Sequence, residues 1–358
     1  MSLLHAEQKV KSLLLTVSQQ NASDIHFVVG RYPTLRIDGK LFPLRKEKVL
    51  TAEDTQAVSD VLLTEDNKKT LLDAGQVDFS YSFENKSRFR VNIYFQKGNI
   101  SIAMRLISSK IKTLEELNLP TSLYDFCNYS QGLILVTGPV GHGKSTTLAA
   151  LLDYINHNFD QNILTIEDPI EYVYEQDRCI VNQREIGSDA KSFPAALKAL
   201  FREDANVVMI GEMRDLETIG TTITAAEIGH LIFATLHTNN SAQTIDRIID
   251  SFPAHQQNQI RLQLASVLVG VISQRLLPRI GGGRVPAIEI MIKNKAIENL
   301  IRENKIYQID SVIETNLGNN MISLDRSLAN LVEKGLITMN DATTYAQDRE
   351  YLKMIIKG

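Results

Sequence analysis

Over the first hundred residues, the spacing of apolar side chains changes between that of helices and that of strands. Near the N-terminus apolar side chains recur at the three- and four-residue spacing of an amphipathic helix: Leu3, Leu4, Val10, Leu13 and Leu14. Short apolar runs such as "DIHFVVG" and a β-rich stretch over 77–107 then predict strands separated by turns. Between them, Thr51 can cap a helix that extends to Leu63. Residues 1–105 are therefore predicted to form an α+β domain with an antiparallel sheet.

The pattern changes after Gly132. The apolar runs "LILVTG", "ILTIED", "VVMIGE" and "LIFATLHT" alternate with helical patterns. This alternation is typical of buried parallel strands in an α/β domain. We expect that domain to cover residues 121–358, after a linker over 106–120. Helical patterning is expected to dominate from about Ile280 to the end.

Composition narrows the class of protein. The 358 residues carry a formal net charge of −4, which indicates no general affinity for nucleic acid or for an anionic membrane. The two cysteines, Cys127 and Cys179, lie far apart and form no CxxC pair, so neither a disulfide nor a zinc site is indicated. Polar residues interrupt the apolar N-terminus, and no apolar run reaches the roughly 18 residues of a membrane span. We expect a cytoplasmic protein.

The stretch "GPVGHGKST" over 138–146 has the spacing of a Walker A loop, between an apolar strand and a helix. Backbone amides of such a loop surround phosphate oxygens at a helix N-terminus. Lys144 is expected to reach the β- and γ-phosphates and Ser145 to ligate Mg²⁺. The residues predicted to bind a nucleoside triphosphate are Gly138, Pro139, Val140, Gly141, His142, Gly143, Lys144, Ser145 and Thr146. The cradle does not require a histidine, so His142 is interpreted first as a packing residue.

Carboxylates follow two of the other apolar runs. "VVMIGEMRD" ends its strand at Glu212, without an aspartate before it, so Glu212 is the main candidate for activating water. "ILTIEDPIEYV" ends another strand at Glu167. Because ligands bind at the carboxyl ends of parallel strands, both glutamates are predicted to lie near the phosphates and Mg²⁺.

His230 and His237 flank "LIFATL". His237 stands at a strand end, where a γ-phosphate sensor would lie, and His230 is weighed equally as a functional and a structural residue.

In the first domain Arg88, Arg90 and Arg105 lie in or beside strands. They are candidates for neutralising transition-state charge on the nucleotide of a neighbouring subunit.

Taken in order, "GPVGHGKSTTLAALLDYIN", "ILTIEDPIEYV", "VVMIGEMRD" and "TAAEIGHLIFATLHT" resemble the secretion ATPases of type IV pili and type II secretion. Within them, the chain is most similar to the PilT-type retraction ATPases, from "SDIHF" at Ser23 almost to the C-terminus. The resemblance implies a RecA-like core and a PAS-like N-terminal domain. It also implies a homohexamer at the inner face of the cytoplasmic membrane that acts on the type IV pilus machinery through a PilC-like platform protein.

Two sequence features help to distinguish a retraction ATPase from an assembly ATPase. The chain lacks the four-cysteine insert of the assembly ATPases, while "AIENLIRE" over 296–303 resembles the retraction signature "AIRNLIRE" with Glu298 in place of an arginine. His142 replaces the usual serine. A pilus assembly or type II secretion ATPase, an accessory retraction ATPase, a RecA-like nucleic-acid motor and a ring that binds nucleotide without hydrolysis remain as alternatives.

Overall fold

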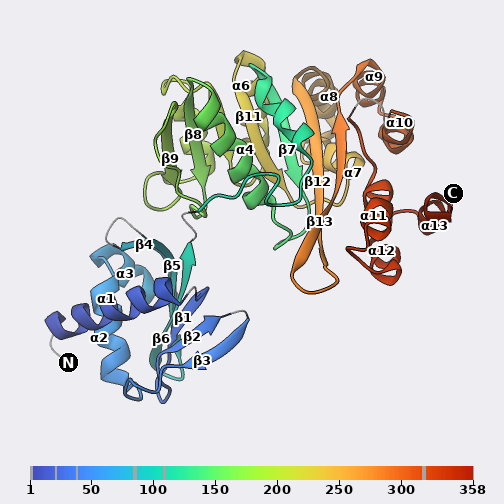
Figure 1. The fold of residues 1–358 in the computed structure, drawn as a ribbon. Coiled ribbons are helices and arrows are strands. Elements are labelled where there is room, and N and C mark those ends of the chain that lie inside the picture. The colour runs from blue at the N-terminus through green and yellow to red at the C-terminus, as the bar shows by residue number, and fades with distance from the viewer. Residues whose placement is uncertain are drawn as a thin grey trace. The chain divides into compact units, whose positions relative to one another are not determined.

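The computed structural model describes residues 3–20, 22–37, 39–83, 87–107, 110–316 and 320–357. The chain divides into two compact units, Met1–Lys110 with Pro169–Val173, and Ile111–Asp168 with Tyr174–Gly358. Figure 1 shows the elements of both units. Within the predicted linker, Ser108 and Ser109 lie outside the described residues.

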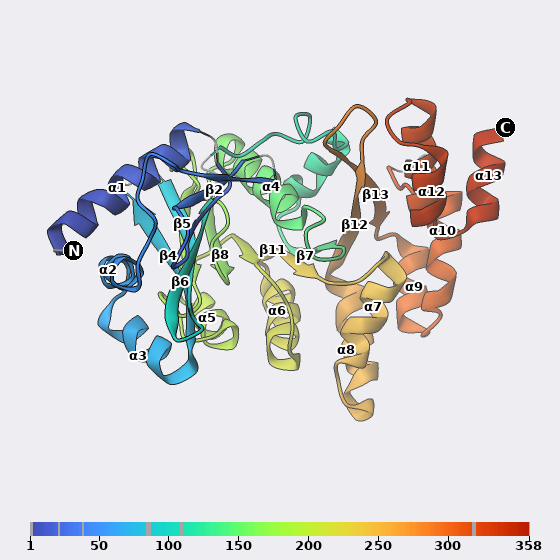
Figure 2. The same ribbon diagram turned by 90° about the horizontal axis from the view of Figure 1, so that it is seen from below.

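The first unit is built on a six-stranded antiparallel sheet with the order β3-β2-β1-β6-β5-β4. Its elements are α1 (Leu3–Gln19), β1 (Asp24–Phe27), β2 (Thr34–Ile37), β3 (Lys40–Pro43), α2 (Ala52–Leu62), α3 (Glu65–Ala74), β4 (Gln76–Phe83), β5 (Ser87–Gln96) and β6 (Asn99–Ile107). The three helices cover one face of the sheet (Figure 2).

Local sequence explains the start of α2. Thr51 is its N-cap and accepts a hydrogen bond from the backbone N–H of Asp54, while the Asp54 carboxylate accepts from the Thr51 N–H. This reciprocal capping box supplies acceptors to two backbone N–H groups at the helix start. The apolar faces of α1 and α2 pack on the sheet around Phe27 and Phe89, both fully buried. The helix predicted from Thr51 is thus confirmed.

The second unit contains a seven-stranded sheet with the order β13-β12-β7-β11-β10-β8-β9, in which only β13 is antiparallel to its neighbour. Its strands are β7 (Gly132–Thr137), β8 (Asn162–Glu167), β9 (Ile180–Glu185), β10 (Val207–Ile210), β11 (Leu231–Leu236), β12 (Leu268–Pro278) and β13 (Arg284–Ile292). Its helical elements are η1 (Thr121–Asn128), α4 (Lys144–Asn158), α5 (Phe193–Leu200), α6 (Leu216–Ile228), α7 (Ser241–Asp250), α8 (Ala254–Val267), α9 (Lys295–Arg302), η2 (Ile306–Gln308), α10 (Ile309–Thr315), α11 (Leu324–Glu333), α12 (Met339–Tyr345) and α13 (Arg349–Lys357).

Helices cover both faces of this sheet. α4 lies on one face, whereas α5, α6 and α8 lie on the other (Figure 2). Every residue of β7, β10 and β11 is buried, which explains their uninterrupted apolar sequences. The predicted α/β fold class is confirmed.

Helices dominate after about Ile280, as expected, but they begin only at α9, because the strand β13 precedes them. This strand pairs with β12 over nine residues, from Pro278↔Arg284 to Gly270↔Ile292. The residues from Val285 to Met291 are all buried, so the run lacks the alternation that marks a half-exposed strand. Periodicity alone does not separate such a run from a buried helix.

Candidate functional site

The strand order brings four predicted segments to one edge of the second sheet. β7, β11, β10 and β8 are parallel neighbours, and their registers pair Thr137 with Leu236, Ala234 with Ile210 and Ile210 with Ile166. The chain that follows each strand therefore emerges at the same carboxyl edge. That edge carries the Walker A loop, His237, Glu212 and Glu167.

The Walker A loop leads from buried β7 into α4. Gly143 is the N-cap of α4 and has φ +85°, a left-handed conformation that glycine adopts without strain. Lys144 is the first helical residue and only 8% exposed. Its Nζ donates to the carbonyl oxygens of Gly138 at 2.9 Å and Pro139 at 3.1 Å. The ammonium group thus lies inside the loop, next to the amides that would surround phosphate.

His237 joins the lysine to the glutamate. Its Nδ1 lies 3.2 Å from Nζ of Lys144, and its Nε2 lies 3.0 Å from Oε1 of Glu212. A lysine ammonium can only donate, so Nδ1 accepts and the proton of a neutral imidazole is on Nε2, from which it is donated to Glu212. This arrangement links the phosphate-binding cation to the carboxylate predicted to activate water.

Glu212 is held from its other side by Arg214. Nη2 of Arg214 donates to Oε2 of Glu212 at 2.7 Å. Burial opposes ionisation of Glu212, but the hydrogen bond from Arg214 and the proximity of His237 outweigh it, and the pKa of Glu212 falls below its usual range. The carboxylate is therefore ionised at neutral pH and able to accept a proton.

Glu167 ends β8 and is 6% exposed. Its Oε1 accepts from Oγ1 of Thr165 at 2.7 Å and from Nε2 of Gln183 at 3.2 Å. Within the part of the chain that the structure describes, no group of three or more His, Cys, Asp or Glu side chains is placed to hold a metal ion. Ser145, Glu167 and Glu212 offer hydroxyl and carboxylate oxygens, the ligand type that suits Mg²⁺, and a complete coordination shell would need phosphate or water oxygens as well.

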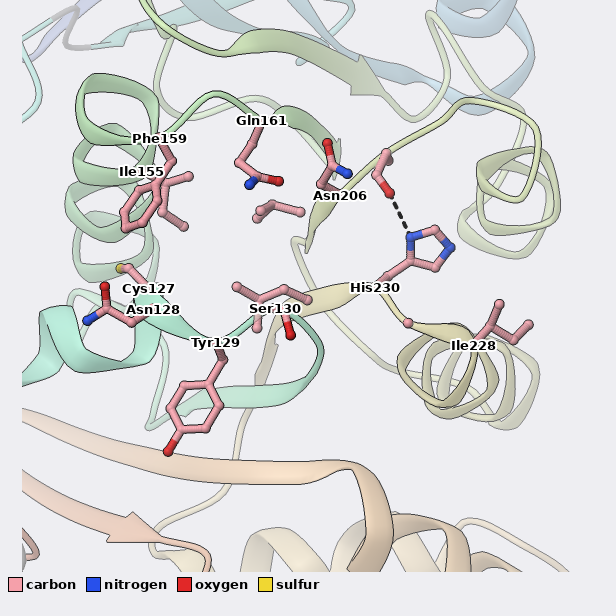
Figure 3. A pocket seen from close by; sticks show the side chains of 14 residues that line it. Cys127, Asn128, Tyr129, Ser130, Ile155, Phe159, Gln161, Asn206, Ile228 and His230 are labelled. Atoms are coloured by element: carbon pink, nitrogen blue, oxygen red, sulfur yellow. Dashed lines mark hydrogen bonds between the residues drawn. The ribbon is translucent and has the colours of Figure 1, made fainter.

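The structure does not bring His230 to this edge. It precedes β11, whereas His237 follows it, and six strand residues separate opposite sheet edges by about 20 Å. Its Nδ1 donates to the Ala205 carbonyl at 2.7 Å. The ring lines a cavity of about 460 Å³ together with Asn206, Gln161 and Tyr129 (Figure 3). His230 is thus hydrogen-bonded away from the Walker A loop, and its predicted functional role stays a prediction.

The three arginines of the first unit lie on β5 and β6. Arg90 and Arg105 are cross-strand partners, and Arg105 is also the cross-strand partner of Asp24. Nε of Arg105 donates to Oδ1 of Asp24 at 2.9 Å. Arg90 and Arg105 are exposed and Arg88 is half-buried. Their predicted role toward a nucleotide stays a prediction.

The segment 296–303 forms most of α9, capped by Asn294. Glu298, which replaces an arginine of the retraction signature, receives a hydrogen bond from Lys295 at 3.0 Å and also pairs with Arg302. Ile297 and Ile301 are fully buried beneath it. The reversed charge is thus compensated within one helix.

Arg214 and Gln274 are among the residues that contact the site and that sequence reasoning missed. Arg214 stands two residues after Glu212, and this spacing on an extended segment could have indicated it. Gln274 lies on β12, more than a hundred residues from the Walker A loop, and receives a hydrogen bond from Thr147 at 2.7 Å. No local sequence pattern marks a contact of that kind.

A parallel α/β sheet with a Walker A loop, an ionised glutamate and a histidine between them defines a P-loop nucleotide-binding protein. Comparison with known proteins narrows this class. The family model described as "Type II/IV secretion system protein" matches residues 3–284. The chain therefore belongs to the type II/IV secretion system protein family.

Two relatives cover nearly the whole chain. The chain is 44% identical over 343 residues to the type IV pilus retraction ATPase PilT of Pseudomonas aeruginosa, covering 94% of this chain and 98% of that protein. It is 42% identical over 342 residues to a twitching motility protein of Neisseria gonorrhoeae, covering 95% and 91%. The predicted similarity to the PilT-type ATPases is thus confirmed.

A solved structure agrees with the sequence relatives. The crystal structure of the pilus retraction motor PilT with bound ADP superimposes with a TM-score of 0.91 at 44% identity, covering 96% of this chain and 99% of that one. Among the described residues of this chain, no helix has the length and apolar character required to cross a membrane.

Proposed function

We propose that this chain is an ATP-hydrolysing motor that powers type IV pilus retraction and thereby twitching motility. The observation that carries the proposal is the contact series from Lys144 through His237 to Glu212 at one sheet edge. It joins a phosphate-binding cation to an ionised carboxylate. The similarity to PilT over almost the full length indicates that hydrolysis would drive pilus retraction.

The roles of the residues follow from their chemistry. Backbone amides over 138–146 and the Lys144 ammonium bind the phosphates of ATP. Ser145 and Glu167 would contribute oxygen ligands to Mg²⁺, and the ion would neutralise charge on the phosphates. Glu212 orients a water molecule toward the γ-phosphorus and accepts its proton as the P–O bond to ADP breaks. His237 registers whether Lys144 is engaged with the γ-phosphate.

A homohexameric ring is part of the proposal. Cross-strand pairing places Arg36, Asp24, Arg105 and Arg90 in one row across β2, β1, β6 and β5. Such a row carries three positive side chains on neighbouring strands, and Arg88 lies on β5 close to it. Arginine from a neighbouring subunit would neutralise charge that develops on the γ-phosphate during hydrolysis.

The partners proposed for this ring are the type IV pilus machinery and a PilC-like platform protein in the inner membrane. The ring would act from the cytoplasmic side, as a peripheral assembly. The similarity to pilus motors supports this location. No nucleic-acid partner is proposed, since the net charge of −4 provides no basic surface excess.

Cells that lack the gene test the proposed work directly. Pilus number and twitching are measured after complementation with wild type, Lys144→Ala or Lys198→Ala, a control lysine that pairs with Glu217 on the surface. We expect cells without the gene to carry many pili and to be unable to twitch. Wild type and Lys198→Ala should restore twitching, whereas Lys144→Ala should not. Bald cells would show an assembly motor instead. ATP turnover that rises on addition of DNA would indicate a nucleic-acid motor.

A further inference from the structure

We propose that Gln274 of β12 is a positioning residue for the Walker A loop, which it holds in the shape that binds phosphate. The inference deepens the proposed function and rests on it, because it concerns the same nucleotide site. Gln274 is 3% exposed and contacts both the loop and the first turn of α4.

Both ends of the Gln274 amide are used. Its Nε2 donates to the carbonyl of His142 at 2.9 Å, and its Oε1 accepts from Oγ1 of Thr147 at 2.7 Å. Thr147 is fully buried. One side chain thereby fixes a residue before the helix start and a residue one turn into the helix. The position of Lys144, which lies between these two anchor points, depends on both.

A second contact from β12 reaches the same loop residue. The backbone N–H of Leu276 donates to Nδ1 of His142 at 3.0 Å. Burial and the nearby cations Arg275, Lys144 and Arg284 lower the pKa of His142, which keeps the ring neutral and Nδ1 able to accept. His142 is thus bound to β12 by its carbonyl and by its ring.

The packing around Gln274 explains the two outer glycines of the loop. A Cβ at Gly138 would lie 2.4 Å from the carbonyl oxygen of Gln274, and a Cβ at Gly143 would lie 2.8 Å from its Nε2. A side chain at Gly138 would displace the backbone of β12 or the loop, and one at Gly143 would displace the Gln274 amide. The glutamine and the two glycines therefore form one close-packed unit.

This contact bears on nucleotide binding for a general reason. Loop amides bind an anion most tightly when they are already oriented, because no free energy is then spent on ordering them. β7 anchors the loop at one end, whereas β12, its parallel neighbour, holds the middle and the helix start. The alternative is that Gln274 is only a satisfied buried polar group whose loss would lower stability alone.

Gln274→Met separates these two roles in the full-length chain, since methionine has a similar shape and makes no amide hydrogen bonds. The probes are a fluorescent ADP analogue for Kd, steady-state ATP hydrolysis for KM and kcat, and thermal unfolding without nucleotide. Gln176→Met is the control, because Gln176 also uses both ends of its amide, toward Val181, away from the loop. Thr147→Val removes the second hydrogen bond together with the contact of the same hydroxyl with the Gly143 carbonyl, and Thr147→Ser keeps both.

We expect Thr147→Val to raise Kd and KM about fivefold, and Gln274→Met, which loses both hydrogen bonds, to raise them about thirtyfold, since each hydrogen bond would contribute about 1 kcal/mol. Thr147→Ser and Gln176→Met should bind like wild type. Unchanged Kd in Gln274→Met and Thr147→Val, with a lowered Tm, would overturn the inference while the proposed function stands. A wild-type chain that binds no ADP analogue would overturn the proposed function itself.

Discussion

Glu212 combines two features that usually oppose each other, partial burial and a lowered pKa. Arg214 and His237 supply the compensating hydrogen bonds, one to each carboxylate oxygen. A carboxylate in this state can orient and deprotonate water, whereas an amide of the same shape can only orient it. The two functions are therefore separable by a single substitution.

Glu212→Gln should lower ATP turnover by about 100-fold or more, the usual contribution of a general base. Binding of a fluorescent ADP analogue should stay near the wild-type value, because the Walker A loop is unchanged. Glu217→Gln, on the exposed start of α6, is the matched control and should hydrolyse ATP normally. Full turnover in Glu212→Gln would remove the carboxylate from the mechanism.

Arg214→Ala tests the cause of the lowered pKa. Without the guanidinium, only His237 still opposes the effect of burial on Glu212, and the pKa rises. Glu212 must be ionised to accept a proton, so the acid limb of the pH profile of kcat should move to higher pH. Arg178→Ala, which loses an exposed pair with Asp160, should leave the profile in place. If the acid limb of the kcat profile stays in place in Arg214→Ala, a group other than Glu212 determines it.

At the scale of elements, the Walker A loop is defined as much by β12 as by its own sequence. Gly141 and Gly143 both have positive φ, +77° and +85°. A Cβ at Gly141 meets no atom within 4 Å, whereas one at Gly143 meets Nε2 of Gln274 at 2.8 Å. The two glycines share backbone strain on substitution but differ in steric cost.

Gly143→Ala should therefore weaken ADP binding more than Gly141→Ala does. We expect the former to raise Kd by more than about tenfold, which corresponds to about 1.4 kcal/mol, and the latter by less. Equilibrium titration of both variants with the same fluorescent nucleotide gives the comparison. Equal losses would mean that backbone strain alone decides the effect.

Sequence predicted those elements whose signals are local. The capping box at Thr51, the buried parallel strands and the strand–loop–helix order around Lys144 were all visible, because each depends on neighbouring residues. β13 was missed because its buried residues do not alternate with polar ones. Gln274 was missed for a different reason, since strand pairing that brings β12 beside β7 cannot be inferred from either strand alone.

At the scale of the whole molecule, a buried carboxylate connects the helical C-terminal region to the nucleotide-binding sheet. Glu289 of β13 is 1% exposed. Its Oε1 accepts from the N–H and Oγ of Ser241 at the start of α7, and its Oε2 accepts from Nε2 of Gln347, before α13. Asp325 of α11 in turn accepts from the backbone N–H of Gln347 and Asp348.

Glu289→Ala should lower the free energy of unfolding by about 2–4 kcal/mol, because it leaves buried donors without an acceptor. Glu289→Gln should cost less, since an amide oxygen can still accept from Ser241. Denaturant unfolding of the two variants gives the comparison, and similar losses would contradict the hydrogen-bond explanation.

The same carboxylate should make stability depend on pH. Burial raises the pKa of Glu289, although the hydrogen bonds from Ser241 and Gln347 oppose the rise. The folded chain therefore holds the proton more tightly than the unfolded chain does. Its contribution to the free energy of unfolding is full below the ordinary pKa of a glutamate and declines as pH rises through the raised value. Glu289→Gln should flatten this part of the stability profile.

β12 contacts both parts of the chain that would report on a phosphate. Gln274 binds the Walker A loop, and the adjacent Arg275 donates to the carbonyl and side-chain oxygens of Asn239, two residues beyond His237. Consecutive residues of one strand cannot shift independently. A movement of β12 during the ATPase cycle would weaken phosphate binding by the Walker A loop. The same movement would shift the segment that carries His237, so both changes would accompany release of the product.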